Sequence, residues 1–154
     1  MEHEAIRRNA DERGRLITLV AQITETDLHA IVHGEWTVAA TLAHMAFWDR
    51  FALATLKRWA DGQPSRIDVS DWYDDVLNHA LLAGSLALEP SMAARLAVEA
   101  ATAIDGRLSN LGDVDSQRLT EEAARPETDA NWLLHRYRHR AEHLDAIEQV
   151  LPDR

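Results

Sequence analysis

Two long amphipathic segments occupy the first part of the chain. Between residues 3 and 26, apolar side chains recur at broadly helical spacing, which predicts a first helix. A polar connection follows from Thr24 to Glu35. Thr37 can then cap a second helix that runs to Ala60 without Gly or Pro, and Gly62 lies where a helix stop is expected.

The middle of the chain contains two further predicted helices, separated by a proline. The first begins near Asp71, after a loop, and ends near Leu88. Pro90 separates it from the second, which continues to about Asn110 before the stop at Gly112.

A polar stretch over residues 113–128 precedes the last predicted helix. It includes Pro126 and predicts a connection with room for one short helical turn. The last helix starts near Asp129 and continues to Pro152. Because no segment shows strand alternation, we predict an all-α bundle that forms a single domain over residues 1–154.

One histidine lies inside the apolar part of the second predicted helix, in Thr41-Leu-Ala-His-Met-Ala-Phe-Trp48. At about 100° per residue, His44 shares its face with Thr41 and Trp48, while Arg50 and Lys57 fall on the other side. His44 therefore points toward the core. Such a residue is either a hydrogen-bonded core histidine or a metal ligand, and the neighbours alone leave both interpretations open.

The last predicted helix carries His139 and His143, whose spacing lets both rings reach one ion from the same face. Chance spacing is the other explanation in a chain with 8 His. With His44, the pair would supply three nitrogen ligands and leave a position for water or substrate. The chain has no Cys, so any metal site must use His, Asp or Glu. Ligation needs neutral imidazole, so ordinary histidine behaviour predicts weaker metal binding below about pH 6.

The charge balance excludes several classes of partner. With 26 acidic against 16 basic residues, the formal charge of −10 repels phosphate backbones and anionic lipid surfaces, so we expect neither nucleic acid nor membrane as a partner. The N-terminal residues lack the apolar core of a signal peptide, and no apolar stretch is long enough to span a bilayer. We therefore expect a cytoplasmic protein with a small-molecule substrate. A homodimer is one assembly that we expect for it.

Two patterns, in this order along the chain, resemble the DinB superfamily. Gly34-Glu-Trp-Thr-Val38, followed by Leu42-Ala-His44 and Trp48, is similar to the opening of that family's second helix. His139-Arg-Ala-Glu-His143, followed by Ile147, is similar to its closing pattern. The resemblance covers nearly the whole chain.

This resemblance implies an up-down-down-up four-helix bundle with a long crossover, and a divalent metal bound by His44, His139 and His143. Zinc is the expected ion, with nickel or iron as alternatives. Members of that family include S-transferases that use bacillithiol, mycothiol or glutathione, and a mycothiol-dependent maleylpyruvate isomerase. By analogy we expect a metal-dependent enzyme with S-transferase or isomerase-like chemistry that joins a low-molecular-weight thiol to a small electrophile. The alternative is a non-catalytic ligand-binding or stress-response protein with a structural metal.

Four more polar residues are candidates for a role beside the metal. His135 precedes His139 by one helical turn, so His135 and His139 are an alternative ligand pair. The resemblance favours His139 and His143, and His135 is then either a base at the rim of the site or a surface residue. Arg136 and Arg140 fall within the predicted buried arc, where they either pair with carboxylates of other helices or bind an anionic substrate. Asn78 stands where many members of the family have an Asn, and its amide either orients a ligand or serves packing.

The remaining histidines and the tryptophans have simpler predicted roles. His33 lies in a polar segment, like His3 and His29, and is predicted to be a surface residue. The five tryptophans are predicted to fill the core, with Trp48 as a candidate wall of a cavity.

Overall fold

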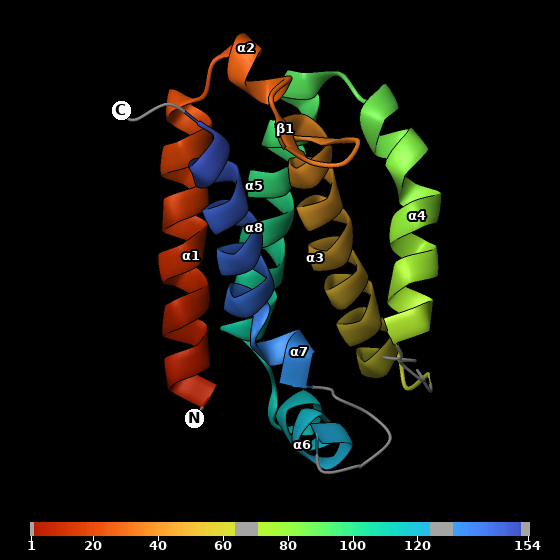
Figure 1. Cartoon of the computed structure of the whole chain (residues 1–154). Helices are drawn as coiled ribbons and strands as arrows, with labels where there is room; N and C mark the ends of the chain where they lie inside the picture. Colours follow the sequence, from red (N-terminus) through yellow and green to blue (C-terminus); the bar gives the residue numbers. More distant parts are fainter. Residues whose placement is uncertain (1, 64–70, 124–130, 152–154) are drawn as a thin grey trace.

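Four long helices form an up-down-down-up bundle in the computed structural model, which describes residues 2–63, 71–123 and 131–151 (Figure 1). Helices α1 (Glu2–Gln22) and α8 (Arg136–Val150) run in one direction, and α3 (Val38–Ala60) and α5 (Pro90–Leu108) run in the opposite direction. The all-helical bundle predicted from the sequence pattern is therefore confirmed.

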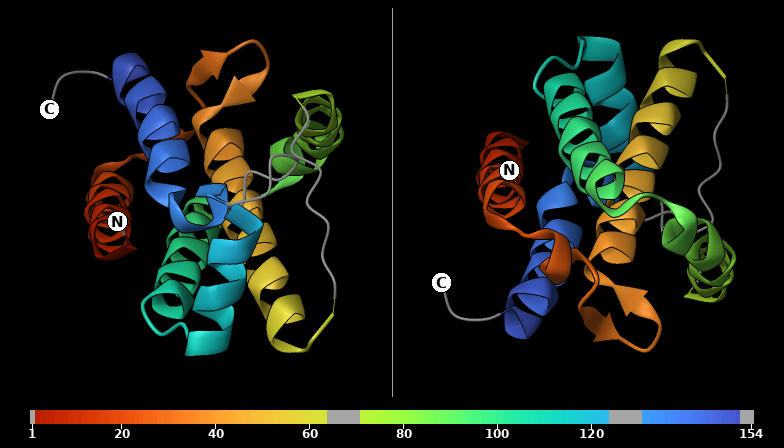
Figure 2. Two further views of the ribbon diagram at one scale, coloured as in Figure 1. Left: turned by 90° about the horizontal axis from the view of Figure 1, so that it is seen from below. Right: turned by 90° about the horizontal axis from the view of Figure 1, so that it is seen from above.

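A fifth long helix, α4 (Asp71–Ala87), makes the crossover between the parallel helices α3 and α5. Figure 2 looks along the bundle from both ends and shows α4 outside the four-helix arrangement, beside α3. One side of α3 therefore packs against the bundle, and another side faces α4. No helix in the described ranges combines the length and apolar character needed to cross a bilayer.

A short antiparallel hairpin precedes α3 and departs from the purely helical prediction. It consists of β1 (Ile31–His33) and β2 (Trp36–Thr37), which are too short to show an alternating pattern in the sequence. Gly34 in its turn has φ +51°, a conformation that glycine adopts without steric cost. The hairpin leads directly into α3 and so sets the position of Trp36 above the start of that helix.

The ends and faces of α3 follow the sequence prediction. Thr37 is the N-cap, because its side-chain oxygen accepts a hydrogen bond from the amide of Ala40 at 3.0 Å. Gly62, with φ +71°, follows the other end. His44 is only 6% exposed, so α3 turns this histidine inward as predicted.

The last part of the chain differs from the single helix that we predicted. A break at His135 separates α7 (Asn131–Leu134) from α8. The buried side chain of Asn9 on α1 spans this break, donating to the carbonyl of Leu134 and accepting from the amide of Tyr137, both at 2.8 Å. Asn9 thereby satisfies two backbone groups that an interrupted helix would leave unpaired.

Two smaller helices complete the fold. Helix α2 (Glu25–Leu28) lies between α1 and the hairpin, and its N-cap Thr24 forms a capping box with Asp27. Helix α6 (Asp113–Ala123) has 11 residues, so the prediction of one short turn in this segment was wrong. Leu119 of α6 is buried, which explains why a polar segment forms a stable helix against the bundle.

The apolar core consists of two clusters. The first contains Leu16, Leu42 and Leu144, together with small alanines of α3 and α5. The second, near α6 and α7, contains Leu56 and Trp59. Not every tryptophan fills the core as predicted, because Trp72 on α4 is 71% exposed.

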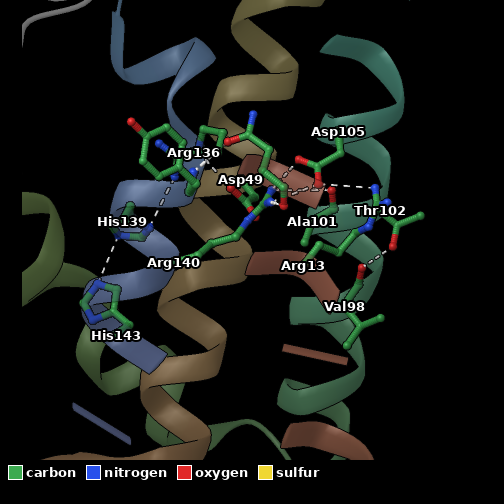
Figure 3. Close-up of polar contacts among 12 residues, drawn as sticks. Arg13, Asp49, Val98, Ala101, Thr102, Asp105, Arg136, His139, Arg140 and His143 are labelled. Atoms are coloured by element: carbon green, nitrogen blue, oxygen red, sulfur yellow. Dashed lines mark hydrogen bonds and ion pairs between the residues drawn. The ribbon is translucent and has the colours of Figure 1, made fainter. Parts of the chain in front are cut away.

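A layer of charged side chains lies between these clusters (Figure 3). Arg140 of α8 is fully buried and forms ion pairs with Asp49 of α3 at 3.0 Å and with Asp105 of α5 at 2.9 Å. It also donates to the backbone carbonyl of Asn9 at 3.1 Å. One guanidinium on α8 therefore contacts the three other helices of the bundle. We call Asp49, Asp105, Arg136 and Arg140 the buried ionic layer.

We expect Asp105→Ala to lower the free energy of unfolding by about 3 to 5 kcal/mol, because it leaves part of the Arg140 charge buried without a partner. Asp145→Ala is the matched control, since Asp145 pairs with Arg15 at the exposed surface, where such a pair contributes at most about 1 kcal/mol. Urea unfolding of the two variants beside the wild type measures the difference. Equal, small losses in both variants would show that Arg140 does not need this partner.

Candidate metal centre

Three histidines from two helices converge on one point. His44 comes from α3, and His139 and His143 come from successive turns of α8. Nε2 of His139 lies 3.1 Å from Nε2 of His44 and 3.1 Å from Nε2 of His143. One ligand atom from each ring lies within 4.8 Å of the other two. The structure thus brings together the three residues singled out in the sequence.

The geometry of the three rings fits a divalent ion. Zinc bound tetrahedrally at about 2.0 to 2.1 Å needs ligand nitrogens roughly 3.4 Å apart. The two separations that involve His139 are 3.1 Å, close to that value, and the nitrogens of all three rings lie within 4.8 Å of one another. Nδ1 of His44 is buried without a hydrogen-bond partner among the described residues, which leaves Nε2 as the atom through which this ring interacts.

The environment keeps these imidazoles neutral, the form that binds metal. Burial, together with the nearby His143 and Arg136, lowers the pKa of His44 to about 3. Burial and the Arg136 charge lower the pKa of His139 well below its usual value, and burial lowers the pKa of His143. Protons therefore compete with a metal ion at a lower pH than the value near pH 6 expected for ordinary histidines.

Arg136 connects the histidines to the buried ionic layer. Its Nε donates to Asp49 at 2.9 Å, and its Nη2 lies 3.3 Å from Nδ1 of His139 (Figure 3). An arginine can only donate, so Nδ1 of His139 is the acceptor here and the proton of the neutral ring lies on Nε2. If Nε2 instead binds an ion, the proton moves to Nδ1, and Arg136 gives up this hydrogen bond while keeping its pairing with Asp49.

The three histidines line a cavity of about 620 Å³. Its walls are aromatic: the ring of Trp36 lies 5.4 Å from that of His44, and Trp48 lies 6.3 Å from His44 on the other side. Phe51 and Trp132 stack 5.9 Å apart and extend this wall. The cavity is large enough for a small molecule beside the histidines.

Asn78 of α4 faces this cavity, as the resemblance implied. Its Oδ1 accepts a hydrogen bond from Nε1 of Trp48 at 3.1 Å, which anchors the crossover helix to α3. With the oxygen engaged in this way, the amide NH₂ is the group that Asn78 can offer to a ligand.

The other candidates lie elsewhere. Arg140 makes the buried ion pairs described above, so the carboxylate-paired interpretation is the one that the structure shows. His135 lies at the helix break with its ring 5.7 Å from that of Tyr137. Neither residue is among the described residues that line the cavity.

Several residues of the site escaped the sequence analysis. His33 of the hairpin is exposed, as predicted for a surface residue, and it also lines the cavity, which the sequence did not indicate. Glu142 of α8 and Asp74 and Asp75 of α4 also line it. Asp49 was not singled out, although an acidic partner for the arginines of α8 was expected. The available signal for Asp49 was its position as a carboxylate within the apolar run of α3. The places of the other residues at the cavity depend on how the hairpin and α4 pack.

The fold and the site together define an all-helical bundle protein with a three-histidine cluster that could hold a divalent ion. A family model of the DinB superfamily matches residues 9–147, so the chain belongs to the DinB superfamily. No curated protein and no solved structure shows significant similarity to the chain. Membership therefore supports the fold and the metal-site pattern, and the chemistry must be argued from the site itself.

We expect the metal-free protein to lose stability as the pH falls below 6.5. Each buried histidine has a folded-state pKa below that of the unfolded chain, so the unfolded state takes up protons that the folded state does not. Between pH 6 and pH 5, His44→Gln should flatten this dependence by up to about 1.4 kcal/mol per pH unit. Unfolding free energies measured in chelator test this, with His79→Gln as the control. Parallel pH profiles for wild type and His44→Gln would contradict the buried neutral histidine.

Proposed function

We propose that this protein is a metal-dependent enzyme that transfers a low-molecular-weight thiol to a small electrophile. The observation that carries the proposal is the placement of three imidazole nitrogens on one side of an open cavity. Among the described residues, this group of potential ligands contains no fourth protein side chain. An open position beside a cavity is typical of catalytic metal sites, whereas structural sites are closed by a fourth protein ligand.

Each residue has a defined task in this proposal. His44, His139 and His143 would hold the ion, with zinc expected for nitrogen ligands in a chain without Cys and nickel or iron as alternatives. A bound ion would act as a Lewis acid that lowers the pKa of a thiol or water, making a nucleophile available at neutral pH. The protein has no thiol of its own, so the thiol is a cosubstrate. The amide NH₂ of Asn78 would orient the bound molecule, and the aromatic walls would exclude water.

His44→Ala should abolish tight binding of zinc and lower any thiol-transfer rate by roughly a hundredfold or more, because it removes one of three ligands and with it the Lewis acid. Metal content of the untagged protein and a screen of small thiols against a chromogenic haloaromatic electrophile measure both effects. His79→Ala is the matched control, since His79 is exposed on α4. Unchanged metal content in His44→Ala would remove the three-histidine model.

The same proteins distinguish a catalytic from a structural ion. The bundle is stabilised by its two apolar clusters, so chelation should lower the melting temperature only modestly. If chelation alone unfolds the protein at room temperature, the ion is structural, because its binding energy is then folding energy. That result would favour the non-catalytic alternative.

A further inference from the structure

The cavity beside the histidines has an uneven distribution of charge. Three carboxylates line it, those of Asp74 and Asp75 from α4 and Glu142 from α8. Among the described lining residues, the cationic side chain is that of Arg136, which is 2% exposed and already paired with Asp49 at 2.9 Å. Among the described residues that line it, the cavity therefore offers the carboxylates of Asp75 and Glu142 to a ligand, while the cation of Arg136 is already paired.

The carboxylates lie toward solvent and the histidines toward the core. Asp75 and Glu142 are exposed and Asp74 is half-buried, whereas His44 is buried. A ligand that extends from the three histidines to solvent can keep one end beside these carboxylates. With a divalent ion on the histidines, the inner end of the cavity would be positive and the outer end negative.

The cavity is also lined by electron-rich rings, of which that of Trp132 already carries the Arg136 guanidinium over its face at 5.0 Å. Trp48 contacts Phe51 and Trp132 with ring centroids 5.6 and 6.3 Å apart, and Trp36 packs edge-on to His44. The faces of indole and phenyl rings attract cations, and aromatic walls combined with carboxylates are the usual means of binding alkylammonium groups.

We propose that the molecule bound here carries a cationic nitrogen, held between the aromatic walls and the carboxylates of Asp75 and Glu142. Its other end points toward the three histidines. The inference rests on the proposed function for the reacting end: if a thiol is the cosubstrate, the thiol is an aminothiol and not a thiol with carboxylates at its outer end. The group of potential metal ligands among the described residues is that of the three histidines, so the proposal assigns these carboxylates to the ligand and not to the ion.

The first experiment uses metal-free protein, so that it does not depend on the proposed chemistry. Phenethylamine, 2-phenylethanol and phenylacetate share one aromatic ring and differ in charge, and isothermal titration calorimetry measures their dissociation constants. We expect phenethylamine to bind about tenfold more tightly than 2-phenylethanol, and phenylacetate to bind most weakly. Added salt should reduce this preference, because exposed carboxylates contribute to it.

The double variant Asp75→Asn/Glu142→Gln should reduce the preference for phenethylamine to less than about twofold, while 2-phenylethanol binds as before because the aromatic walls are intact. Glu99→Gln/Glu121→Gln is the matched control. It changes the net charge by the same amount at exposed positions of α5 and α6 and should leave the preference unchanged. Equal binding of the three probes by the wild type, or an equal loss of preference in both double variants, would overturn the proposal.

The second experiment uses zinc-loaded protein and three thiols of similar size: cysteamine, 2-mercaptoethanol and 3-mercaptopropionate. We expect KM to be lowest for cysteamine and highest for 3-mercaptopropionate, with a smaller spread in the Asp75→Asn/Glu142→Gln variant. If no thiol reacts but phenethylamine still binds selectively, the result contradicts the thiol-transfer function and supports a cationic ligand. If the thiols react but their KM values have the opposite order, the result contradicts a cationic ligand and supports the metal-dependent function.

Discussion

One fully buried guanidinium, that of Arg140, determines which face of α8 points into the core. Arg140 extends from α8 to Asp49, Asp105 and the backbone of Asn9, so it contacts the other three helices of the bundle at one level. His139 and His143 lie one residue before and three residues after Arg140, which places both on the same side of α8, about 60 to 100° away from it. With Arg140 held in the core, both histidines must face the cavity between α3 and α4. The arrangement of the three histidines thus depends on ion pairs that are not part of the histidine group.

Burying such a layer costs free energy, because ion pairs lose much of their hydration when they are buried. Apolar residues of similar volume would often stabilise a bundle as well or better. What the buried ionic layer provides here is a specific register. Asp49 accepts hydrogen bonds from both Arg136 and Arg140, and Arg136 also contacts His139, so the position of one of the three histidines is tied to the packing of the helices.

Periodicity and spacing were sufficient to predict the long helices, the inward face of His44 and the pairing of His139 with His143, because these features depend on local geometry. The break at His135 was not predictable in the same way. It depends on Asn9, a residue far away in the sequence whose amide replaces two backbone hydrogen bonds of the last helix. The hairpin was missed because its strands are very short, and with it the place of the exposed His33 at the cavity.

The roles of the acidic residues could likewise not be predicted from their neighbours in the sequence, because these roles depend on how the helices pack. The two arginines on the buried arc of α8 indicated that acidic partners exist, yet nothing local identified Asp49 and Asp105 as those partners. Asp75 and Glu142 are ordinary surface residues by their neighbours in the sequence. They meet at one cavity only because the crossover helix α4 lies beside α3, opposite α8.

The most direct test of the account is a crystal structure of the zinc-loaded protein with anomalous diffraction measured on both sides of the zinc edge. The account predicts a single strong zinc peak bound by Nε2 of His44, His139 and His143, with the remaining coordination position open to the cavity. It also predicts that Arg140 keeps its contacts with Asp49 and Asp105 while Nη2 of Arg136 has turned away from Nδ1 of His139. A zinc peak elsewhere, or a fourth protein side chain closing the site, would contradict it.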